Sequence, residues 1–196
     1  MDEAAEAESE DAGAESEDAA ADDNGGSQDV EVFISYRVRP DEELAGELRT
    51  LLESAIDPRP RVFVSGLGGL RASADSYREQ LRTAARSAKA YVGLITKASV
   101  DREWIYFEAG AAFGRSVLYA PVLVDVAPSE LPSSIGGYQG ATATDQTRMR
   151  DFVEDVAKAI GAKLSDPRIS QVVSGALVIF RGQGESMAPA RVQRAS

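Results

Sequence analysis

The first candidates for chemistry in this chain are an aromatic and an acidic side chain, Trp104 and Glu108, in a segment of helical character. Residues four apart on a helix lie on one face, so these two side chains are neighbours. The chain contains no histidine and no cysteine, which removes the commonest general base, the commonest metal ligands and any thiol nucleophile. We therefore expect no metal site, and any chemistry must run on carboxylates, hydroxyls, arginine and lysine.

A second group of polar residues follows two expected strands. Ser35, Tyr36 and Arg37 come at the end of the first strand, and Ser65 and Gly66 follow the second. In an open parallel sheet the ligand crevice lies at the carboxyl ends of the strands, where the strand order reverses. We expect these residues to line that crevice, beside the helix that carries Trp104 and Glu108.

The elements that position these residues are indicated by hydrophobic periodicity. Short apolar runs alternate with segments of helical period, which is typical of βαβ units. The expected strands are residues 30–35, 61–64, 90–96 and 117–124, with a weak fifth strand near Tyr138. The expected helices are one capped by Asp41, one capped by Asp75 or Ser76, residues 101–114, and one capped by Asp145 and closed by Gly161. The connection rules favour an α/β, flavodoxin-like three-layer sandwich with a five-stranded parallel sheet of order 2-1-3-4-5.

The charge of the chain is concentrated at its N-terminus. Residues 1–29 carry 12 acidic and no basic side chains, whereas the other 20 acidic side chains are balanced by 21 basic ones. Because residues 1–29 also lack aromatic and branched aliphatic residues, we expect a disordered acidic tail there. A single domain is expected over residues 30–162, followed by a C-terminal extension, 163–196, of unknown structure. With no signal peptide, no long apolar run and no basic face, we expect a cytoplasmic protein without nucleic-acid or membrane partners.

Four short motifs occur in order on the expected elements. They are VFISYR at residues 32–37, RVFV at 61–64 before a glycine-rich loop, WIYFE at 104–108, and APVLV at 120–124. Together they resemble the Toll/interleukin-1 receptor (TIR) domain family over about residues 30–160. The first motif resembles the family's first strand, and the second resembles its second strand and BB loop. The third resembles the W-x-x-x-E helix of its catalytic members, and the fourth resembles the strand that follows this helix. One tetrapeptide is a weak signal, but four motifs in the right order are a strong one.

The resemblance implies an activity. Residues 107–114 are similar to microbial TIR proteins, many of which cleave NAD+ at the nicotinamide glycosidic bond and release nicotinamide with ADP-ribose or a cyclised ADP-ribose. Some of these act in antiphage defence. The resemblance implies that Glu108 is catalytic, that NAD+ is the substrate with no further cofactor, and that TIR domains self-associate or join other TIR or defence-system proteins. The loop after the second strand lacks the acidic residue that the family often has there.

Such cleavage suits the residue types present. Nicotinamide leaves as a neutral molecule from a cationic ring, so no general acid is required. The Glu108 carboxylate can stabilise an oxocarbenium-like ribose, and Trp104 can form a wall of the site. Arg37 or Arg39 can bind the pyrophosphate oxygens.

Other readings stay open at this point. A non-catalytic TIR adaptor signals only by homotypic association, and adaptors commonly lack the glutamate at position 108. A nucleoside deoxyribosyltransferase-like enzyme shares the architecture, but the FISYR motif argues against it. Individually, Glu108 can be a solvated helix carboxylate and Trp104 a packing residue, while Arg37 can pair with a surface acid. The loop that contains Gly66 does not fit a phosphate-binding fingerprint.

Overall fold

Five parallel strands form the main sheet of the protein. The computed structural model describes residues 29–65, 74–135, 137–138, 140–165, 173–176 and 180. The expected acidic tail and most of the glycine-rich loop lie outside these residues. The strands are β1 (Val32–Ser35), β3 (Val62–Val64), β4 (Ala90–Thr96), β5 (Leu118–Val124) and β6 (Ala141–Thr142), in the order β3-β1-β4-β5-β6. Counted within this sheet alone, this is the expected order 2-1-3-4-5. The fifth strand begins three residues after Tyr138, the position expected for it.

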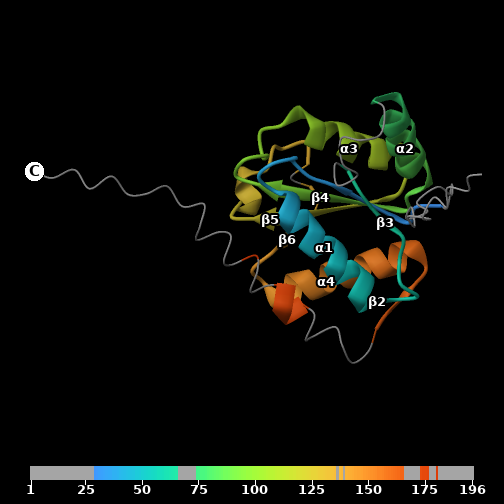
Figure 1. Ribbon diagram of the computed structural model, residues 1–196. Helices are drawn as coiled ribbons and strands as arrows, with labels where there is room; N and C mark the ends of the chain where they lie inside the picture. Colours follow the sequence, from blue (N-terminus) through green and yellow to red (C-terminus); the bar gives the residue numbers. More distant parts are fainter. Residues whose placement is uncertain are drawn as a thin grey trace, which may run out of the picture.

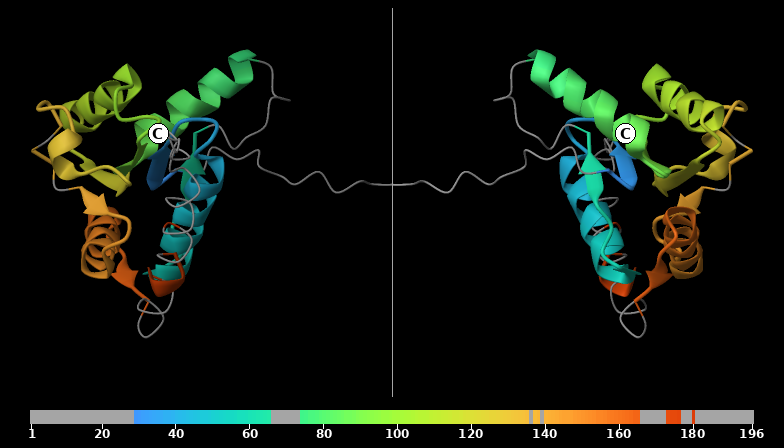
Figure 2. Two further views of the ribbon diagram at one scale, coloured as in Figure 1. Left: turned by 90° about the vertical axis from the view of Figure 1, so that its left-hand side faces the viewer. Right: turned by 90° about the vertical axis from the view of Figure 1, so that its right-hand side faces the viewer.

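Helices cover both faces of the sheet. They are α1 (Glu42–Ala55), α2 (Ala74–Ser87), α3 (Glu103–Gly114) and α4 (Gln146–Ile160), with a short 3-10 helix, η1 (Pro128–Glu130), after β5. In Figure 1, α2 and α3 lie above the strands and α1 and α4 lie below them. The two opposite views in Figure 2, each turned by 90° from Figure 1, show the same layers from the sides. The α/β three-layer prediction is therefore confirmed.

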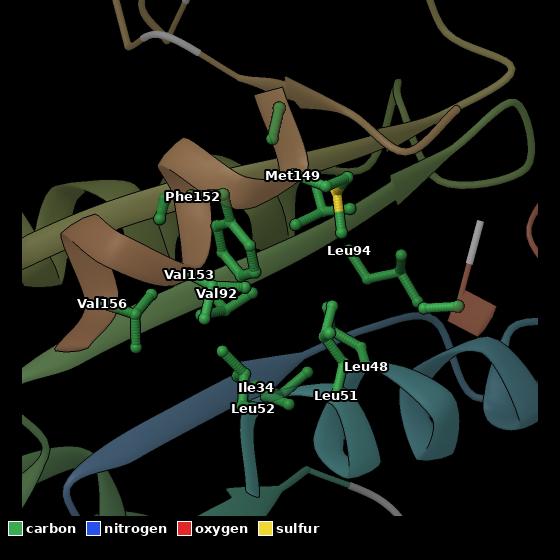
Figure 3. Packing of buried hydrophobic residues seen from close by; sticks show 14 of the residues in the cluster. Ile34, Leu48, Leu51, Leu52, Val92, Leu94, Met149, Phe152, Val153 and Val156 are labelled. Atoms are coloured by element: carbon green, nitrogen blue, oxygen red, sulfur yellow. The ribbon is translucent and has the colours of Figure 1, made fainter. Parts of the chain in front are cut away.

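The larger half of the core lies between the sheet and the pair α1 and α4. Figure 3 shows side chains of the two helices converging on β1 and β4, with Leu48, Leu52 and Met149 facing Ile34 and Val92. All five are almost completely buried. The apolar residues of α1 recur at helical spacing, so that one stripe of the helix faces the sheet, as the sequence predicts.

The opposite half of the core is richer in aromatic residues. The Phe33 ring stacks on that of Phe63, with 5.5 Å between ring centroids, and also meets the Tyr91 ring at 5.3 Å. Helix α3 contributes Ile105 and Ala109 to this layer. Two large apolar side chains of α3, Phe107 and Phe113, are instead 66% and 78% exposed. Helix α3 is thus apolar on both its inner and outer sides, which is unusual for a helix that covers a sheet.

Helix ends test the capping predictions. Asp145 caps α4 by accepting hydrogen bonds from the backbone N–H groups of Thr147 and Arg148, at 2.9 and 3.1 Å. Gly161 ends α4 with a φ of 78°, the left-handed conformation that glycine adopts without steric cost. Asp41 occupies the N-cap position of α1 but its side chain makes no capping hydrogen bond, so that prediction is wrong. The reason is tertiary: its carboxylate bonds to Thr96 instead.

Helix α2 begins two residues earlier than a cap at Asp75 would place it, and three residues earlier than a cap at Ser76 would. Its first residue is Ala74, so Asp75 and Ser76 lie inside the first turn rather than at the N-cap. Asp75 is a common N-cap residue type and Ser76 begins a capping-box pattern with Glu79, but such local signals leave the start of a helix uncertain by a few residues.

A small second sheet joins segments far apart in the chain. The strand β2 (Ile56–Asp57) pairs antiparallel with β7 (Lys163–Leu164). Beyond β7, Val173, Ala176 and Phe180 lie in the same core cluster as α1 and α4, and Phe180 is 0% exposed. The extension expected over residues 163–196 therefore contributes both a strand and core side chains to the domain.

No helix within the described part of the chain is long and apolar enough to cross a bilayer.

Candidate functional site

The carboxyl ends of β1 and β3 bring two of the expected site residues side by side. Ile34 of β1 pairs with Val64 of β3, and the Ser65 N–H continues the ladder with a 2.9 Å hydrogen bond to the Ile34 carbonyl. Ser35 and Ser65 are therefore neighbours at this edge, and both are buried. Side chains alternate along a strand, so Ser35 faces the same side as Phe33, towards α2 and α3.

Tyr36 points to the other side of the sheet. Its side chain belongs to the core cluster between the sheet and the pair α1 and α4, and it is 7% exposed. Glu108 lies on α3, across the sheet from that cluster. The structure thus brings Ser35, rather than Tyr36, onto the side of the sheet that carries Glu108.

Arg37 links two loops at the top of the sheet. Its Nη1 donates a 2.6 Å hydrogen bond to the carbonyl oxygen of Ala98, which follows β4. Since the two residues are 61 positions apart, this bond closes the edge between β1 and β4, at the switch point of the sheet. The neighbouring Lys97 is bonded to Glu130 of η1, and that bond lowers the pKa of the Glu130 carboxyl. Arg39 is exposed nearby along the chain.

A buried polar cluster lies beneath this edge. Thr96, the last residue of β4, donates a 2.9 Å hydrogen bond from Oγ1 to Oδ2 of Asp41. The Thr96 N–H donates to Ser99 Oγ, also at 2.9 Å. Asp41 is 0% exposed, and burial raises the pKa of its carboxyl, while the Thr96 bond and the positive charge of Arg37 act in the opposite direction. The cluster holds the start of α1 against the loop that leads to α3.

Glu108 lies on the inner side of α3. The residue is 3% exposed, and both carboxylate oxygens are buried. Its neighbours on the buried side of the helix are Ile105, Ala109 and Ala112. Burying a carboxylate costs free energy unless other groups interact with it, so its retention points to a function or to a specific partner.

Tyr119 of β5 lies in the layer that Glu108 faces. Burial raises the pKa of the Tyr119 phenol, and the negative charge of Glu108 raises it further. The phenol is therefore a neutral O–H donor throughout the ordinary pH range. The Tyr119 ring also meets that of Tyr138 edge-on, with 5.1 Å between centroids.

Two of the expected site residues lie partly or wholly outside the part of the chain that the structure describes. Gly66 lies outside the described residues, as does the rest of the glycine-rich loop to residue 73. Trp104 is placed in the first turn of α3, but its side chain lies outside what the structure describes. Within the described ranges, no group of three acidic side chains is arranged to hold a metal ion.

Sequence reasoning missed three residues of this region. Asp41 is predicted only as a helix cap, Thr96 only as the end of a strand and the start of a loop at the crevice, and Tyr119 only as a strand residue. The local signal at Asp41, an acidic residue directly before a helix, is the same whether its carboxylate caps that helix or bonds to another element. Nothing in the local pattern distinguishes the hydroxyls of Thr96 and Tyr119 from those of other strand residues.

Together these features define a class of protein: a doubly wound α/β domain with polar residues gathered at its switch point and a buried carboxylate on the helix after the central strand. Residues 32–160 match the TIR domain family. The chain therefore belongs to the TIR domain family, as the four sequence motifs predict.

Several solved structures are similar to this chain. A TIR-STING receptor from C. gigas in complex with 2',3'-cGAMP is 23% identical with a TM-score of 0.46, and the match covers 69% of this chain and 40% of the receptor chain. Another structure of a TIR-STING receptor from C. gigas gives 21% identity, a TM-score of 0.48 and coverages of 67% and 41%. The TIR domains of the activated Roq1 resistosome, which recognises the effector XopQ, are 17% identical to this chain with a TM-score of 0.40. That match covers 77% of this chain and 99% of the other. The chain thus matches about two fifths of the length of the receptor. A comparison with curated proteins found no match.

Proposed function

We propose that this chain is a TIR-domain NAD+ glycohydrolase that releases nicotinamide and either ADP-ribose or a cyclic ADP-ribose, in defence or stress signalling. The observation that supports the proposal most strongly is the buried carboxylate of Glu108, in the W-x-x-x-E position of α3. A purely structural glutamate on a helix surface would be solvated, and burying its charge costs free energy unless an interaction repays it.

Glu108 would act as an electrostatic stabiliser in this reaction. As the glycosidic bond to nicotinamide lengthens, positive charge develops on the ribose, and a nearby carboxylate lowers the energy of that state. Apolar neighbours such as Ile105 and Ala109 exclude water, which strengthens the interaction between the two charges. Water or a second group of the substrate then takes the place of nicotinamide.

The other expected residues would bind the substrate. Ser35 and Ser65 offer two adjacent hydroxyls on the α2 and α3 side of the sheet. Arg37 carries the positive charge suited to pyrophosphate, and its Nη1 donates a hydrogen bond to the Ala98 carbonyl oxygen.

Access to Glu108 requires a rearrangement. Both of its carboxylate oxygens are buried, so the substrate must reach them after the segments over the carboxylate move. We propose that self-association of TIR domains drives this change, and that activity therefore depends on assembly. NAD+ and further copies of the domain are then the main partners, with other TIR or defence-system proteins as additional ones.

The test is direct incubation of concentrated protein with NAD+, followed by chromatographic separation of nicotinamide, ADP-ribose and cyclic ADP-ribose. The matched control is the Glu108→Gln protein at the same concentration. Release of nicotinamide by the wild type alone supports the proposal. Equal release by both proteins would remove Glu108 from the mechanism, and no release by either would contradict the glycohydrolase.

One observation favours a second candidate, a non-catalytic adaptor. Phe113 near the end of α3 is 78% exposed, and exposed aromatic side chains are enriched at protein interfaces. An adaptor would form assemblies without consuming NAD+, so the same incubation, combined with light scattering, separates the two candidates.

A further inference from the structure

Basic side chains gather where the strands of the main sheet begin. Arg61 directly precedes β3, and Lys89 directly precedes β4. Arg86 lies in the last turn of α2, and Arg115 follows the last residue of α3. All four residues are exposed. We call them the basic edge, because they mark the amino-terminal edge of the sheet, opposite the switch-point residues.

Hydrogen bonds hold members of the basic edge close together. The Glu31 N–H donates to the Arg61 carbonyl oxygen at 3.0 Å, and the Lys89 N–H donates to the Glu31 carbonyl oxygen at 2.9 Å. Arg115 Nη1 donates to the Ala88 carbonyl oxygen, also at 2.9 Å. Arg61 and Lys89 therefore flank Glu31, and Arg115 contacts the chain next to Lys89.

The basic edge carries more positive charge than its neighbours neutralise. Lys89 Nζ lies 3.7 Å from Glu31 Oε1, and the Lys89 side chain is still 53% exposed. Arg86 forms no ion pair within the described ranges. Arg115 uses its Nη1 for carbonyl oxygens at the end of α2, which carry only partial negative charge. Positive charge is therefore left unbalanced on this surface.

The most acidic segment of the chain joins the domain at this surface. Residues 1–29 carry 12 acidic and no basic side chains. The Asp29 carbonyl oxygen accepts a 2.8 Å hydrogen bond from Arg61 Nε, and the Val30 N–H donates to Ser87 Oγ, at the end of α2, at 3.1 Å. The segment therefore enters the domain between Arg61 and the end of α2. Tethering gives it an effective concentration on the order of millimolar at this surface, so that weak contacts suffice to hold it.

The opposite edge of the sheet has acidic helix starts. Glu42 and Glu43 lie in the first turn of α1, and Glu103 lies in the first turn of α3. All three side chains are exposed. Acidic residues at helix starts and basic residues at helix ends both suit the helix dipole, which explains why the two edges differ in charge. An acidic segment is repelled by the first edge and attracted by the basic edge.

We propose that residues 1–28 dock by charge attraction on the basic edge of the same chain. These residues lie outside the part of the chain that the structure describes, and their charge and their point of attachment identify them as the partner of this surface. Attraction between many carboxylates and a basic surface does not require the segment to adopt one fold, which agrees with its composition. The docking is independent of the proposed NAD+ cleavage.

A spin label in the segment tests the docking in the full chain. The chain has no cysteine, so Ser9→Cys provides a single thiol for a nitroxide label. The label broadens amide NMR signals of nearby residues, and we expect strong broadening at Arg86, Lys89 and Arg115. A flexible linker of the 20 residues from Ser9 to Asp29 spans about 25 Å, so tethering alone also broadens some signals there. The part due to charge should fall several-fold as salt rises from about 0.1 M to about 1 M, since the Debye length shrinks from about 10 Å to about 3 Å.

Charge changes on the basic edge provide the matched comparison. In the labelled chain, Arg86→Glu combined with Lys89→Gln should reduce the broadening several-fold at low salt, because the surface no longer attracts the segment. The control, Arg102→Glu combined with Arg150→Gln, changes the net charge equally at exposed positions elsewhere and should leave the broadening as it is. The same spectra show whether each variant is folded. If the first double variant does not fold, Arg86→Glu alone decides the matter.

Two outcomes would overturn the docking. Broadening that is insensitive to salt and equal in the wild type and the Arg86 variant would mean that the segment stays nearby only because it is tethered. The second outcome is detected by mixing a labelled chain without isotope enrichment with an enriched, unlabelled chain. Broadening at Arg86 in the enriched chain as strong as in the single-chain experiment would place the segment on a second copy.

Discussion

Thr96 Oγ1, at the end of β4, donates a 2.9 Å hydrogen bond to Asp41 Oδ2, at the start of α1, across 55 positions of the chain. The bond is completely buried and lies at the switch point between β1 and β4. It fixes the loop that carries Arg37 against the loop that leads into α3. The position of α3, and hence of Glu108, depends in part on this contact.

The first prediction concerns Asp41 and pH. Burial raises the pKa of its carboxyl above the ordinary value of 3.8, so the folded state binds this proton more tightly than the unfolded state. The stability contributed by protonated Asp41 is therefore complete below the unfolded pKa and is lost as the pH rises through the folded pKa. We expect Asp41→Asn, which cannot ionise, to gain stability relative to the wild type as the pH rises from about 4 to 7.

Urea unfolding at a series of pH values measures this difference. The control is Glu42→Gln, which removes a charge from the next residue, at an exposed position. Its stability relative to the wild type should change much less over the same range. A difference between Asp41→Asn and the wild type that stays constant with pH would mean that Asp41 titrates normally.

The second prediction concerns Glu108. Glu108→Gln keeps the size of the side chain and removes its charge. We expect NAD+ cleavage to fall by roughly 100-fold or more, because loss of a preorganised electrostatic contact typically costs about 2.7–4 kcal/mol. Thermal stability should change little. The control is Glu103→Gln in the first turn of the same helix, where the side chain is exposed. Near-normal turnover by folded Glu108→Gln protein would place the chemistry elsewhere.

The third prediction concerns the C-terminal segment. Phe180 is 0% exposed in the core formed by α1, α4 and the sheet. Replacing a buried phenylalanine with alanine typically costs about 3–5 kcal/mol, so we expect a loss of that order in the free energy of unfolding for Phe180→Ala. Phe113→Ala is the matched control, since Phe113 is 78% exposed. Its effect should stay within about 0.5 kcal/mol. Similar effects of the two substitutions would mean that residue 180 does not pack in solution as it does here.

The fourth prediction concerns assembly. If self-association exposes Glu108, NAD+ cleavage per molecule must increase with protein concentration. We expect the specific activity to fall steeply across roughly a hundredfold dilution and to recover on reconcentration. A specific activity that is flat over the whole series would show that a single domain is sufficient. Light scattering at the same concentrations relates the activity to the oligomeric state.

Much of the fold could be predicted from local patterns. The strand Ala90–Thr96 has the predicted bounds, and α4 has its predicted cap at Asp145 and its predicted end at Gly161. These features depend on residues close together in the chain: an apolar run, a side chain that accepts from N–H groups two and three residues further on, and a glycine with positive φ. The two-residue strands β2 and β7 could not be predicted, because a segment that short has no measurable period.

The sequence by itself determined the family of this protein and the candidate residues, because motifs and periodicity are properties of neighbouring positions. Only the tertiary structure decided how those residues are used. In the structure Tyr36 lies on the other side of the sheet from Glu108, and the Asp41 carboxylate accepts a hydrogen bond from Thr96 instead of capping the N-terminus of α1. The Tyr119 hydroxyl lies against Gly93 in the layer beneath α3. Each of these outcomes joins residues from different elements. Such contacts follow from how helices and strands pack together, which no local pattern encodes.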